Sequence, residues 1–376
     1  MAGFFFYGSL CHAPLRHAVL GRQVEGTAAV LPDYVIFGAA ENPAFSVLVA
    51  GQGTAPGIYV SHLTDQDIAR LDFYQTAFGY RANALRVFTT DGRPCAAHVY
   101  LSHPSDWPAG DLPWDIDAWC QTWGAISVAA AEDFMRHYGQ IAPGDVRRRY
   151  GQMLTRAGAR IRAAQLRPGT SNLRRKFDPE DVVSHRLTHP YTAYFAVEEH
   201  DLSYRRFDGS MGPVLNRAVF ISGDAAIVLP YDPVRDRVMV IEQFRPGPYA
   251  RGDANPWLIE AVAGRIDGGE TPEDAARREA HEEAGLDLQT LLPGPRYYPS
   301  PAAKAEYLYS FIGLTDLPDD KAGVGGLESE AEDIRSHVIS FDRLMALVAS
   351  GEVDNAPLLL LAYFLQALRP SLRAAA

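Results

Sequence analysis

The sequence predicts an α+β protein of two domains, and three observations lead to this expectation. At 376 residues the chain is longer than one hydrophobic core usually supports. Its composition, 47% hydrophobic and 22% charged, is that of a folded protein. Two β-rich regions are separated by a stretch rich in Arg and Lys. We therefore expect a first domain over residues 1–166, a linker over 167–184 and a second domain over 185–376.

Short apolar runs separated by turns rich in Gly, Pro and Asp fill the first region, as in FFFYGSL, APGIYVSHL, ANALRVFTT and AAHVYL. Runs of this length, bounded by such turn residues, are typical of strands. The opening MAGFFFYGSL has no basic segment and only a short apolar run. We expect a first strand there and not a signal peptide.

The basic stretch between the two regions holds ten Arg and Lys residues and no acidic one, from Arg147 to Lys176. We expect a helix up to Leu166, followed by a linker at PGTSN (168–172). A nucleic-acid patch is one interpretation, but the stretch lacks the regularly interleaved aromatics on which bases stack. A solvated helix that offsets the acidity of the protein is favoured.

The net charge and the cysteine content limit the class of binding partner and the cellular compartment that we expect. The net charge of −11 argues against binding to nucleic acids or to anionic membranes. Three cysteines, Cys11, Cys95 and Cys120, lack metal-binding spacing and indicate reduced thiols in a cytoplasmic protein. The run APLLLLAYFLQAL (356–368) is too short to span a bilayer, so we expect a buried helix.

The second region contains AAIVLPYDPVRDRVMVIEQF, two strands around an Asp-Pro turn, and then a short helix with signals at both ends. Thr271 suits the N-cap, Pro272 suits the first helical position, and Asp274 is placed to return a hydrogen bond to the N-cap amide. Gly285 supplies a left-handed C-cap. One face, able to lie close to a sheet, carries Ala275, Ala276, Ala280 and Ala284.

The opposite, exposed face of this helix carries carboxylates. Glu279, Glu282 and Glu283 lie at i, i+3 and i+4, where each like-charged pair destabilises a helix by about 0.2–0.5 kcal/mol. Only Arg277 and Arg278 offer opposite charge. The repulsion becomes favourable if the face binds a hard cation, because Mg²⁺ prefers oxygen ligands and substrate phosphates. We predict a Mg²⁺ site, with Mn²⁺ as an alternative.

The segment GRIDGGETPEDAARREAHEEAGL (264–286) resembles the Nudix box, the signature of hydrolases that split diphosphates linked to another moiety. The resemblance implies that Glu279 and Glu283 ligate the metal together with the backbone carbonyl of Ala263. It places Glu282 close to the same cluster and gives Arg278 the role of steadying the carboxylates.

Two positions of the box are less clear. Ala280 replaces the bulky aliphatic residue of many members. Glu270 has two interpretations, an outer-shell metal contact or favourable electrostatics at the start of the helix.

The flanking sequences, including LPYDPVRDRVMVIEQFRPGPY and GEVDNAPLLLLAYFLQAL, resemble the ADP-ribose pyrophosphatase branch of this family. Pro301 lies 15 residues beyond Leu286, a spacing associated with that branch. The likeness runs from about residue 185 to 370 and is greatest to bacterial members associated with tellurite resistance. It implies an α/β/α sandwich with a mixed sheet, hydrolysis of ADP-ribose to AMP and ribose 5-phosphate, and a homodimer.

A Gly-rich stretch, GVGGLESEAEDIRSHVIS (323–340), offers further carboxylates. In the related enzymes a loop here closes over the substrate. Aligned on EDIR, Glu330 falls on the catalytic base and Glu332 on a metal ligand. An ordinary solvated acidic loop is the alternative.

Substrate contacts also follow from the resemblance. Arg217 and Arg245 match positions that meet phosphate or ribose, although each could instead form a surface ion pair. Glu260 and Glu306 match polar positions of the same cleft. Tyr194 matches a ring that stacks on adenine, with a core tyrosine as the alternative.

The front region, through FFFYGSLCH, PGIYV and LDFYQTAFGYR, resembles the γ-glutamylcyclotransferase-like fold, a small mixed β-barrel. The resemblance implies a pocket at Tyr7, Gly8, Ser9 and Leu10, whose backbone amides face a carboxylate. The catalytic glutamate of the family is here Gln75, and an amide cannot accept a proton at neutral pH. We expect an inactive binding or structural module, unless another group such as Asp72 serves as the base.

Three functional hypotheses follow. The leading one is a cytoplasmic Mg²⁺-dependent ADP-ribose pyrophosphatase with an inactive cyclotransferase-like domain. A broader nucleoside-diphosphate-sugar hydrolase is the second, because Ala302 and Ala303 replace glycines common in relatives. A non-catalytic ADP-ribose sensor is the third, and the intact glutamates speak against it.

Overall fold

The computed structural model describes residues 3–165, 172–176, 178–325 and 332–376. The chain divides into two compact units, Met1–Gln165 and Leu166–Ala376. In the described ranges no helix is both long enough and apolar enough to cross a membrane.

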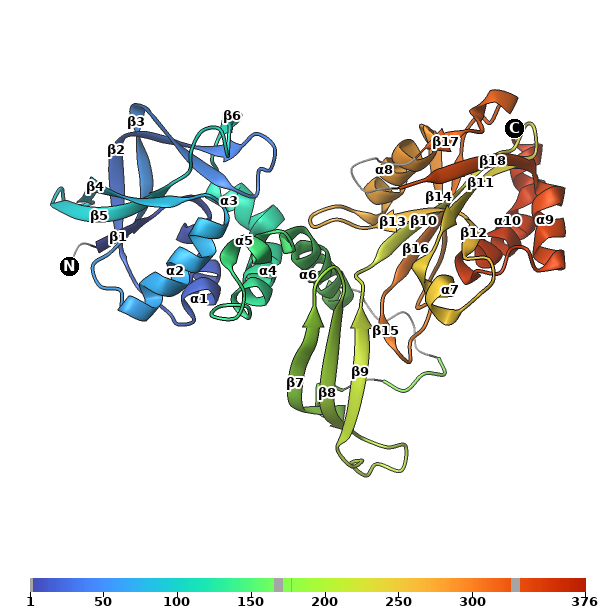
Figure 1. Ribbon diagram of the computed structural model, residues 1–376, viewed down its shortest axis with the longest axis horizontal. Coiled ribbons are helices and arrows are strands. Elements are labelled where there is room, and N and C mark those ends of the chain that lie inside the picture. The colour runs from blue at the N-terminus through green and yellow to red at the C-terminus, as the bar shows by residue number, and fades with distance from the viewer. Residues whose placement is uncertain (1–2, 166–171, 177, 326–331) are drawn as a thin grey trace. The chain divides into compact units, whose positions relative to one another are not determined.

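The strands of the first unit form a barrel (Figure 1). They are β1 (Gly3–Phe6), β2 (Thr27–Ala39), β3 (Ser46–Val60), β4 (Arg81–Thr89), β5 (Pro94–Leu101) and β6 (Ala109–Pro113). β1 lies between an antiparallel β3 and a parallel β5. β5, β4, β2 and β3 then pair in antiparallel fashion and close the ring, and β6 extends β2. The predicted small mixed barrel is confirmed.

Alternate residues of β1 contribute to two apolar cores, as the period of a strand requires. Phe5 packs with residues of the other barrel strands, including Leu31 and Val99. Phe4 and Phe6 pack with the helices outside the barrel. These helices are α1 (Ala13–Leu20), α2 (Asp65–Ala77), α3 (Ile116–Trp119), α4 (Ala125–Met135), α5 (Pro143–Arg147) and α6 (Tyr150–Gln165).

The basic helix α6 is not simply a solvated face. Arg156 is 2% exposed, and its Nη2 lies 2.7 Å from Oδ2 of Asp133 on α4. Part of the basic stretch therefore belongs to the core of the first unit. The burial of Arg156 is tolerated because its guanidinium is paired with a carboxylate.

Helix α2 begins with a capping box whose carboxylate, Asp67, makes the stability of the first unit depend on pH. The side chain of Thr64 accepts from the amide of Asp67, and Asp67 accepts from the amide of Thr64. The hydrogen bond from Arg22 holds the pKa of Asp67 at about 2, below its ordinary value. This carboxylate therefore stabilises the fold above pH ~4, and its contribution is lost as the pH falls from ~4 to ~2.

We expect Asp67→Asn to lower the free energy of unfolding by about 1–2 kcal/mol at pH 7, because Asn still accepts from the amide of Thr64 but loses the charge that pairs with Arg22, and hydrogen bonds to charged groups contribute more than neutral ones. The deficit should shrink towards pH 2. Urea unfolding of the intact chain between pH 7 and pH 2 checks this, with Asp65→Asn, an exposed carboxylate of the same turn, as the control. A deficit independent of pH would contradict the prediction.

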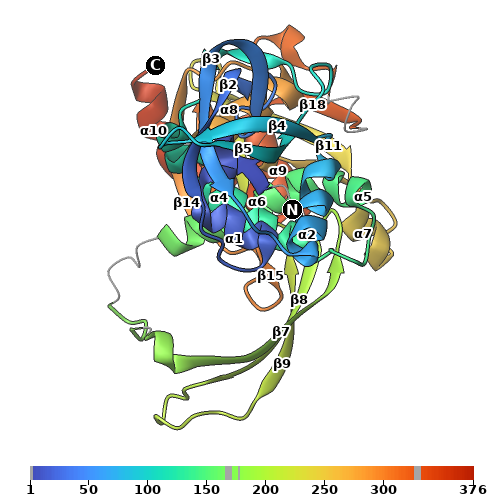
Figure 2. The same cartoon turned by 90° about the vertical axis from the view of Figure 1, so that its left-hand side faces the viewer.

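Two sheets form the second unit. The smaller has the order β15-β9-β8-β7, and β7, β8 and β9 lie side by side in Figures 1 and 2. Its strands are β7 (Val182–Thr192), β8 (Ala196–Tyr204), β9 (Leu215–Ile221) and β15 (Lys304–Ala305). The short β15 pairs in parallel with the end of β9, at Phe220 and Ile221.

The larger sheet has the order β14-β16-β10-β11-β18-β17, with β13 paired to β10 and β12 to β11. Its strands are β10 (Ala225–Asp232), β11 (Arg237–Phe244), β12 (Trp257–Glu260), β13 (Val262–Arg265), β14 (Thr290–Tyr297), β16 (Leu308–Leu314), β17 (Val324–Gly325) and β18 (Ile334–Ser340). β10 and β16 are parallel, whereas β10 and β11 are antiparallel, so the sheet is mixed.

Helices cover both faces of the larger sheet (Figure 1). They are α8 (Pro272–Ala284) on one face and α9 (Phe341–Ser350) and α10 (Ala356–Ala374) on the other, and α7 (Pro246–Arg251) follows β11. Ile227 and Leu229 of β10 pack with α9 and α10. Ala226 and Val228 pack with α8. The expected α/β/α sandwich is confirmed.

Helix α8 has the predicted ends, with one difference. Thr271 caps it by accepting from the amide of Asp274 at 3.1 Å, and Gly285 ends it at φ 60°. The carboxylate of Asp274 does not return to the N-cap amide as expected. It accepts from the hydroxyl of Thr271 at 2.6 Å, because that hydroxyl is the nearer donor.

Candidate active site

Strand β13 and helix α8 bring two expected metal ligands together. The amide of Ala263 donates to Oε2 of Glu283 at 3.2 Å. At the next residue, a Cβ built on Gly264 would lie 1.8 Å from Oε1 of Glu279. A residue without a side chain is thus required for Glu279 to occupy this position. The two carboxylates lie beside adjacent residues of one strand.

Both carboxylates are more enclosed than the sequence indicates. Glu283 is 4% exposed and the side chain of Glu279 is 12% exposed, so the expectation of an exposed helix face is wrong for these two. Burial raises the pKa of Glu279 to about 7, against the opposing charge of Arg278. Burial, and after it the charge of Glu279, raise the pKa of Glu283 to about 8.

Arg278 connects Glu279 to two further carboxylates of the box, Glu270 and Glu282. Its Nε lies 2.9 Å from Oε1 of Glu270, and its Nη1 lies 2.7 Å from Oε1 of Glu279 and 2.9 Å from Oε2 of Glu282. Its Nη2 donates to the carbonyl of Arg265 at 3.1 Å. One guanidinium thus fixes three carboxylates and the end of β13. The paired hydrogen bonds of Glu270 with Arg278 give it a role outside both earlier interpretations, that of holding this arginine.

The carboxylate pair fits a divalent cation. Two enclosed carboxylates beside each other resist being charged together, and a cation between them removes that cost. Across the described ranges, no three His, Cys, Asp or Glu side chains already converge as a metal-binding group. Mg²⁺ needs fewer, because it is often held by one or two carboxylates plus waters and substrate phosphates. Glu279, Glu283 and the carbonyl of Ala263 are the groups suited to hold it.

Of the two site residues expected in the acidic stretch, Glu332 is described. Burial dominates the raised pKa values of Glu279 and Glu283, and the charge of Glu332 adds to both, which places Glu332 near them. The stem of this loop lies against α8, because a Cβ on Gly325 would be 3.0 Å from the carbonyl of Glu283. Glu330, the expected base, lies outside the described residues.

Two residues expected to contact the substrate, Arg245 and Glu260, form an ion pair with each other. Nε of Arg245 lies 2.7 Å from Oε2 of Glu260, and Arg245 is close enough to lower the pKa of Glu283 against the larger effect of burial. Arg245 is thus paired, as one of its two interpretations predicted, yet the pair lies beside the carboxylate cluster. Glu306 accepts from Ser222 at 3.0 Å and pairs with Lys304 at 2.8 Å.

The other two expected contacts lie on the smaller sheet. Arg217 is exposed on β9 opposite His200, and its Nη1 donates to the carbonyl of Asn216 at 2.8 Å. Tyr194, between β7 and β8, is 55% exposed, so it is not a core tyrosine. The guanidinium of Arg265 lies 4.1 Å from the centre of the Tyr194 ring.

The sequence did not single out Arg265 or Lys304 as functional. Both contact expected substrate residues, Arg265 through Tyr194 and Lys304 through Glu306. The period of β13 could have indicated Arg265, since it lies two residues beyond Ala263 on the same side of the strand. The same spacing could have indicated Lys304, which lies two residues before Glu306, whereas its place beside β9 depends on the pairing of β15 with β9.

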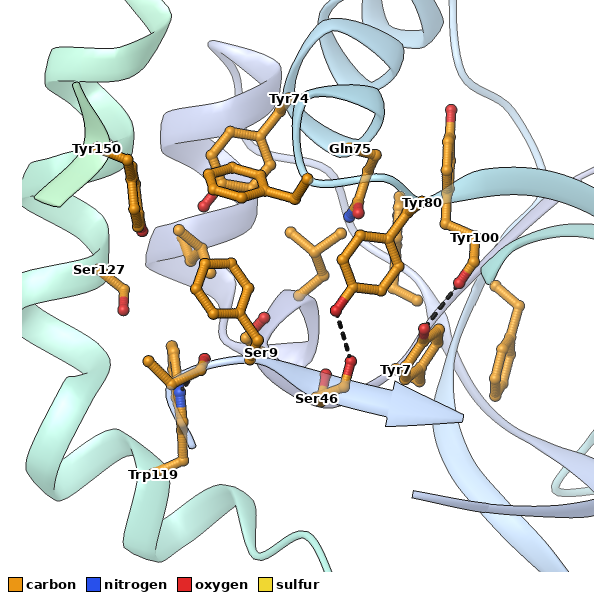
Figure 3. Close-up of a pocket in the computed structure, with 17 residues that line it drawn as sticks. Tyr7, Ser9, Ser46, Tyr74, Gln75, Tyr80, Tyr100, Trp119, Ser127 and Tyr150 are labelled. Carbon is orange, nitrogen blue, oxygen red and sulfur yellow. Dashed lines mark hydrogen bonds between the residues drawn. The ribbon is translucent and has the colours of Figure 1, made fainter. Parts of the chain in front are cut away.

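The front unit contains a separate pocket (Figure 3). Its volume is about 40 Å³, room for no more than a few waters. Gly8 has φ 55°, and a Cβ there would lie 1.8 Å from the hydroxyl of Ser46, so this turn requires glycine. The lining includes Tyr7, Ser9, Leu10 and Gln75 as expected, and none of its side chains carries a charge.

Gln75 points into this pocket from α2 (Figure 3). Within the described ranges its side-chain amide has no hydrogen-bond partner. Asp72, the alternative base, does not line the pocket, and its carboxylate accepts from the hydroxyl of Tyr100. The hydroxyls of Tyr7 and Tyr80 are likewise taken, by the carbonyls of Tyr100 and Ser46.

Gly264 offers a direct test of the carboxylate arrangement. We expect Gly264→Ala to lower kcat/KM for diphosphate hydrolysis by about 100-fold, because the new Cβ displaces Glu279. About 2.7 kcal/mol of lost transition-state stabilisation corresponds to that factor. The fold should persist, because the displaced atoms are the end of a flexible side chain. Steady-state kinetics and a thermal unfolding curve check both points, and Gly247→Ala, where a Cβ meets nothing within 4 Å, is the control.

Comparison with known families agrees with this architecture. Residues 222–361 match the NUDIX domain, and residues 4–121 match the domain described as Gamma-glutamyl cyclotransferase, AIG2-like. The fold, the box and these matches define a Nudix hydrolase, an enzyme class that acts on pyrophosphate bonds.

Curated relatives give the same family for the second unit. The ADP-ribose pyrophosphatase of Escherichia coli (strain K12) is 40% identical over 176 residues, 47% of this chain and 83% of the relative. The ADP-ribose pyrophosphatase of Haemophilus influenzae is 34% identical over 44% of this chain and 76% of its own length. The GDP-mannose pyrophosphatase of Enterobacter sp. (strain 638) is 33% identical over 40% and 77%. The chain belongs to the Nudix hydrolase family.

Proposed function

We propose that the second unit hydrolyses the diphosphate of ADP-ribose to AMP and ribose 5-phosphate in a Mg²⁺-dependent reaction in the cytoplasm, and that Mn²⁺ can replace Mg²⁺. The observation that carries this proposal is the enclosed pair Glu279 and Glu283 beside β13. The likeness to two ADP-ribose pyrophosphatases supports the choice of substrate.

Each part of the site has a role in this reaction. Water attacks one phosphorus, the bridging P–O bond breaks, and the bridging oxygen leaves with the other phosphate. When bound, a divalent cation would neutralise phosphate oxygens and lower the pKa of water. It would be held by Glu279, Glu283, Glu332 and the carbonyl of Ala263. Arg278 and Glu282 would keep these groups in place. The substrate is bound by the residues that the resemblance assigns to it, namely Tyr194, Arg217, Arg245, Glu260 and Glu306.

A panel of nucleoside diphosphate compounds, each assayed with Mg²⁺ and with Mn²⁺, tests the proposal. We expect AMP and ribose 5-phosphate from ADP-ribose at the highest kcat/KM of the panel. Equal turnover of GDP-mannose would favour the broader nucleoside-diphosphate-sugar hydrolase, which the likeness to a GDP-mannose pyrophosphatase supports. Binding of ADP-ribose without turnover would favour the sensor.

Glu330 is proposed as the base that takes a proton from water. Glu330→Gln should lower kcat by about 100-fold or more with little change in substrate affinity, the range expected for a lost general base. Glu328→Gln, two residues earlier in the sequence, is the control. If the whole loss falls in KM, then Glu330 binds substrate and another group is the base.

A homodimer is also proposed for the second unit. Its smaller sheet exposes a set of apolar side chains, a pattern that marks interaction surfaces. They are Val182, Val183, Leu187, Tyr191, Tyr204 and Phe220. Sedimentation of the intact chain should give twice the mass of one chain, and a monomer at micromolar concentration would contradict this.

A further inference from the structure

Glu306, one of the proposed substrate contacts, has a protein donor at each oxygen of its carboxylate. The hydroxyl of Ser222 donates to Oε1 at 3.0 Å, and the ammonium Nζ of Lys304 lies 2.8 Å from Oε2. A carboxylate offers about four acceptor sites, so each oxygen can still accept from a ligand. The two protein donors fix the plane of the carboxylate and therefore the direction in which its remaining acceptor sites point.

This carboxylate is enclosed, which makes the charge of Lys304 important. The side chain of Glu306 is 13% exposed and that of Lys304 is 33% exposed. Burial, and after it the charge of Glu306, raise the pKa of Tyr297 on β14 to about 12, so the phenol that lies near the carboxylate is neutral. The hydroxyl of Ser222 is neutral as well. Burying a carboxylate is costly unless an opposite charge accompanies it, and Lys304 supplies that charge.

The pairing of β15 with β9 holds the lysine in place. Lys304 lies opposite Phe220 in this parallel pair, and Glu306 and Ser222 follow directly after the two strands. Nζ of Lys304 lies 6.0 Å from the ring centre of Phe220, at the outer limit of a cation–π contact. The backbone therefore brings the ammonium to Glu306 before any ligand binds, which reduces the freedom lost on binding.

We propose that Lys304 is a positioning residue, which holds the carboxylate of Glu306 in the orientation that binds the substrate. This rests on the proposed function and deepens it, because it defines the groups that Glu306 can contact. A carboxylate accepts hydrogen bonds and repels phosphate, so Glu306 meets a hydroxyl or amino group of the nucleoside diphosphate. Without the lysine, the enclosed carboxylate would lack an opposite charge and would turn towards water.

The first test is kinetic. Lys304→Met removes the charge and keeps a long side chain, and we expect the KM for ADP-ribose to rise about tenfold with kcat within about twofold, the pattern of lost ground-state binding. Lys304→Arg keeps the charge and should bring KM back to within about threefold of the natural value. Lys321→Met, at an exposed lysine of the same unit, is the matched control and should change neither constant. An unchanged KM for Lys304→Met would overturn the proposal.

A double-mutant cycle shows whether Lys304 acts through Glu306. Glu306→Gln should raise KM by a similar factor, and the chain that carries both Lys304→Met and Glu306→Gln should be no worse than either single variant, because residues that act as one unit are not additive. Two effects that multiply to about 100-fold would show that Lys304 contacts the substrate by itself, and this would overturn the proposal.

IDP-ribose, which lacks the amino group of adenine, identifies the group that Glu306 contacts. A rise in KM upon Lys304→Met that is equal for IDP-ribose and ADP-ribose assigns the contact to a hydroxyl group. A rise for ADP-ribose alone assigns it to the amino group. Both results support the positioning role, since each requires an oriented acceptor.

A further test does not depend on turnover. The sequence has three lysines, Lys176, Lys304 and Lys321, so a chain with isotope-labelled lysine gives three sets of side-chain signals in nuclear magnetic resonance spectra. Lys304→Met identifies the signal of Lys304 by its loss. We expect Glu306→Gln to shift that signal and to leave the other two unchanged.

Failure of the proposed function has a different signature from failure of this inference. A natural chain that hydrolyses no compound of the panel would overturn the proposed function, and equilibrium dialysis of ADP-ribose would then replace KM. Lys304→Met should weaken that binding about tenfold, the same factor as for KM. An unshifted signal of Lys304, or equal affinity of the natural chain and Lys304→Met for ADP-ribose, would overturn the proposal about Lys304 whether or not the chain is active.

Discussion

Glu283→Gln is expected to reduce diphosphate hydrolysis to about 1% or less of the natural rate at saturating Mg²⁺, and Glu279→Gln should do the same. Each change removes one carboxylate of the pair that we propose to hold the cation. Metal-ion catalysis contributes several kcal/mol of transition-state stabilisation, and each 1.36 kcal/mol is a factor of ten in rate.

Neither change should unfold the protein. Gln can still accept the hydrogen bond that the amide of Ala263 donates to Glu283, and it removes a charge from an enclosed site. We therefore expect a melting temperature in metal-free buffer that is equal to or above that of the natural chain. Glu273→Gln, at an exposed position in the first turn of the same helix, is the control. Near-natural turnover by both variants would refute the proposal that Glu279 and Glu283 of α8 hold the cation.

Gln75→Glu is expected to produce the second-largest change, in the other unit. The natural chain should show no cyclotransferase turnover of γ-glutamyl peptides, because an amide is not a base. Restoring a carboxylate that points into the pocket should raise turnover by about 100-fold or more over the background, since general-base catalysis contributes 10²–10⁴-fold.

Release of 5-oxoproline from γ-glutamyl peptides measures this activity, and Gln23→Glu, at an exposed position of the same unit, is the control. The small cavity requires neighbouring side chains to move before a peptide fits. A Gln75→Glu chain without activity would show that the pocket has lost more than its base. Rapid turnover by the natural chain would show that a base other than Gln75 operates.

Local patterns predicted the elements well. The ends of α8 follow from Thr271, Pro272 and Gly285, whose conformational preferences act within one turn of the chain. The runs of short apolar segments indicated strands, whereas the barrel and the sandwich were implied by the resemblance of motifs to two known families. Helix ends and strand runs depend on neighbours in sequence, which the sequence displays directly.

Properties that depend on long-range packing were not predictable. The helical period places Glu279 and Glu283 on one stripe but does not say that β13 covers them, and the burial of Glu283 was therefore missed. The contact of Arg265 with Tyr194 depends on how the two sheets of the second unit meet. A single sequence does not show where those sheets meet, so it could not place this contact.

The first strand of the barrel has a consequence for biosynthesis. Gly3 pairs with Ala97 in β5, and Phe4 pairs with Val60 in β3. At roughly 5–20 residues per second, about 5–20 s pass between the synthesis of β1 and that of β5. During that interval the Phe4–Phe6 segment is outside a closed barrel and is a suitable target for chaperones that hold apolar segments. The strand of this barrel that is synthesised first is thus among the last to be enclosed.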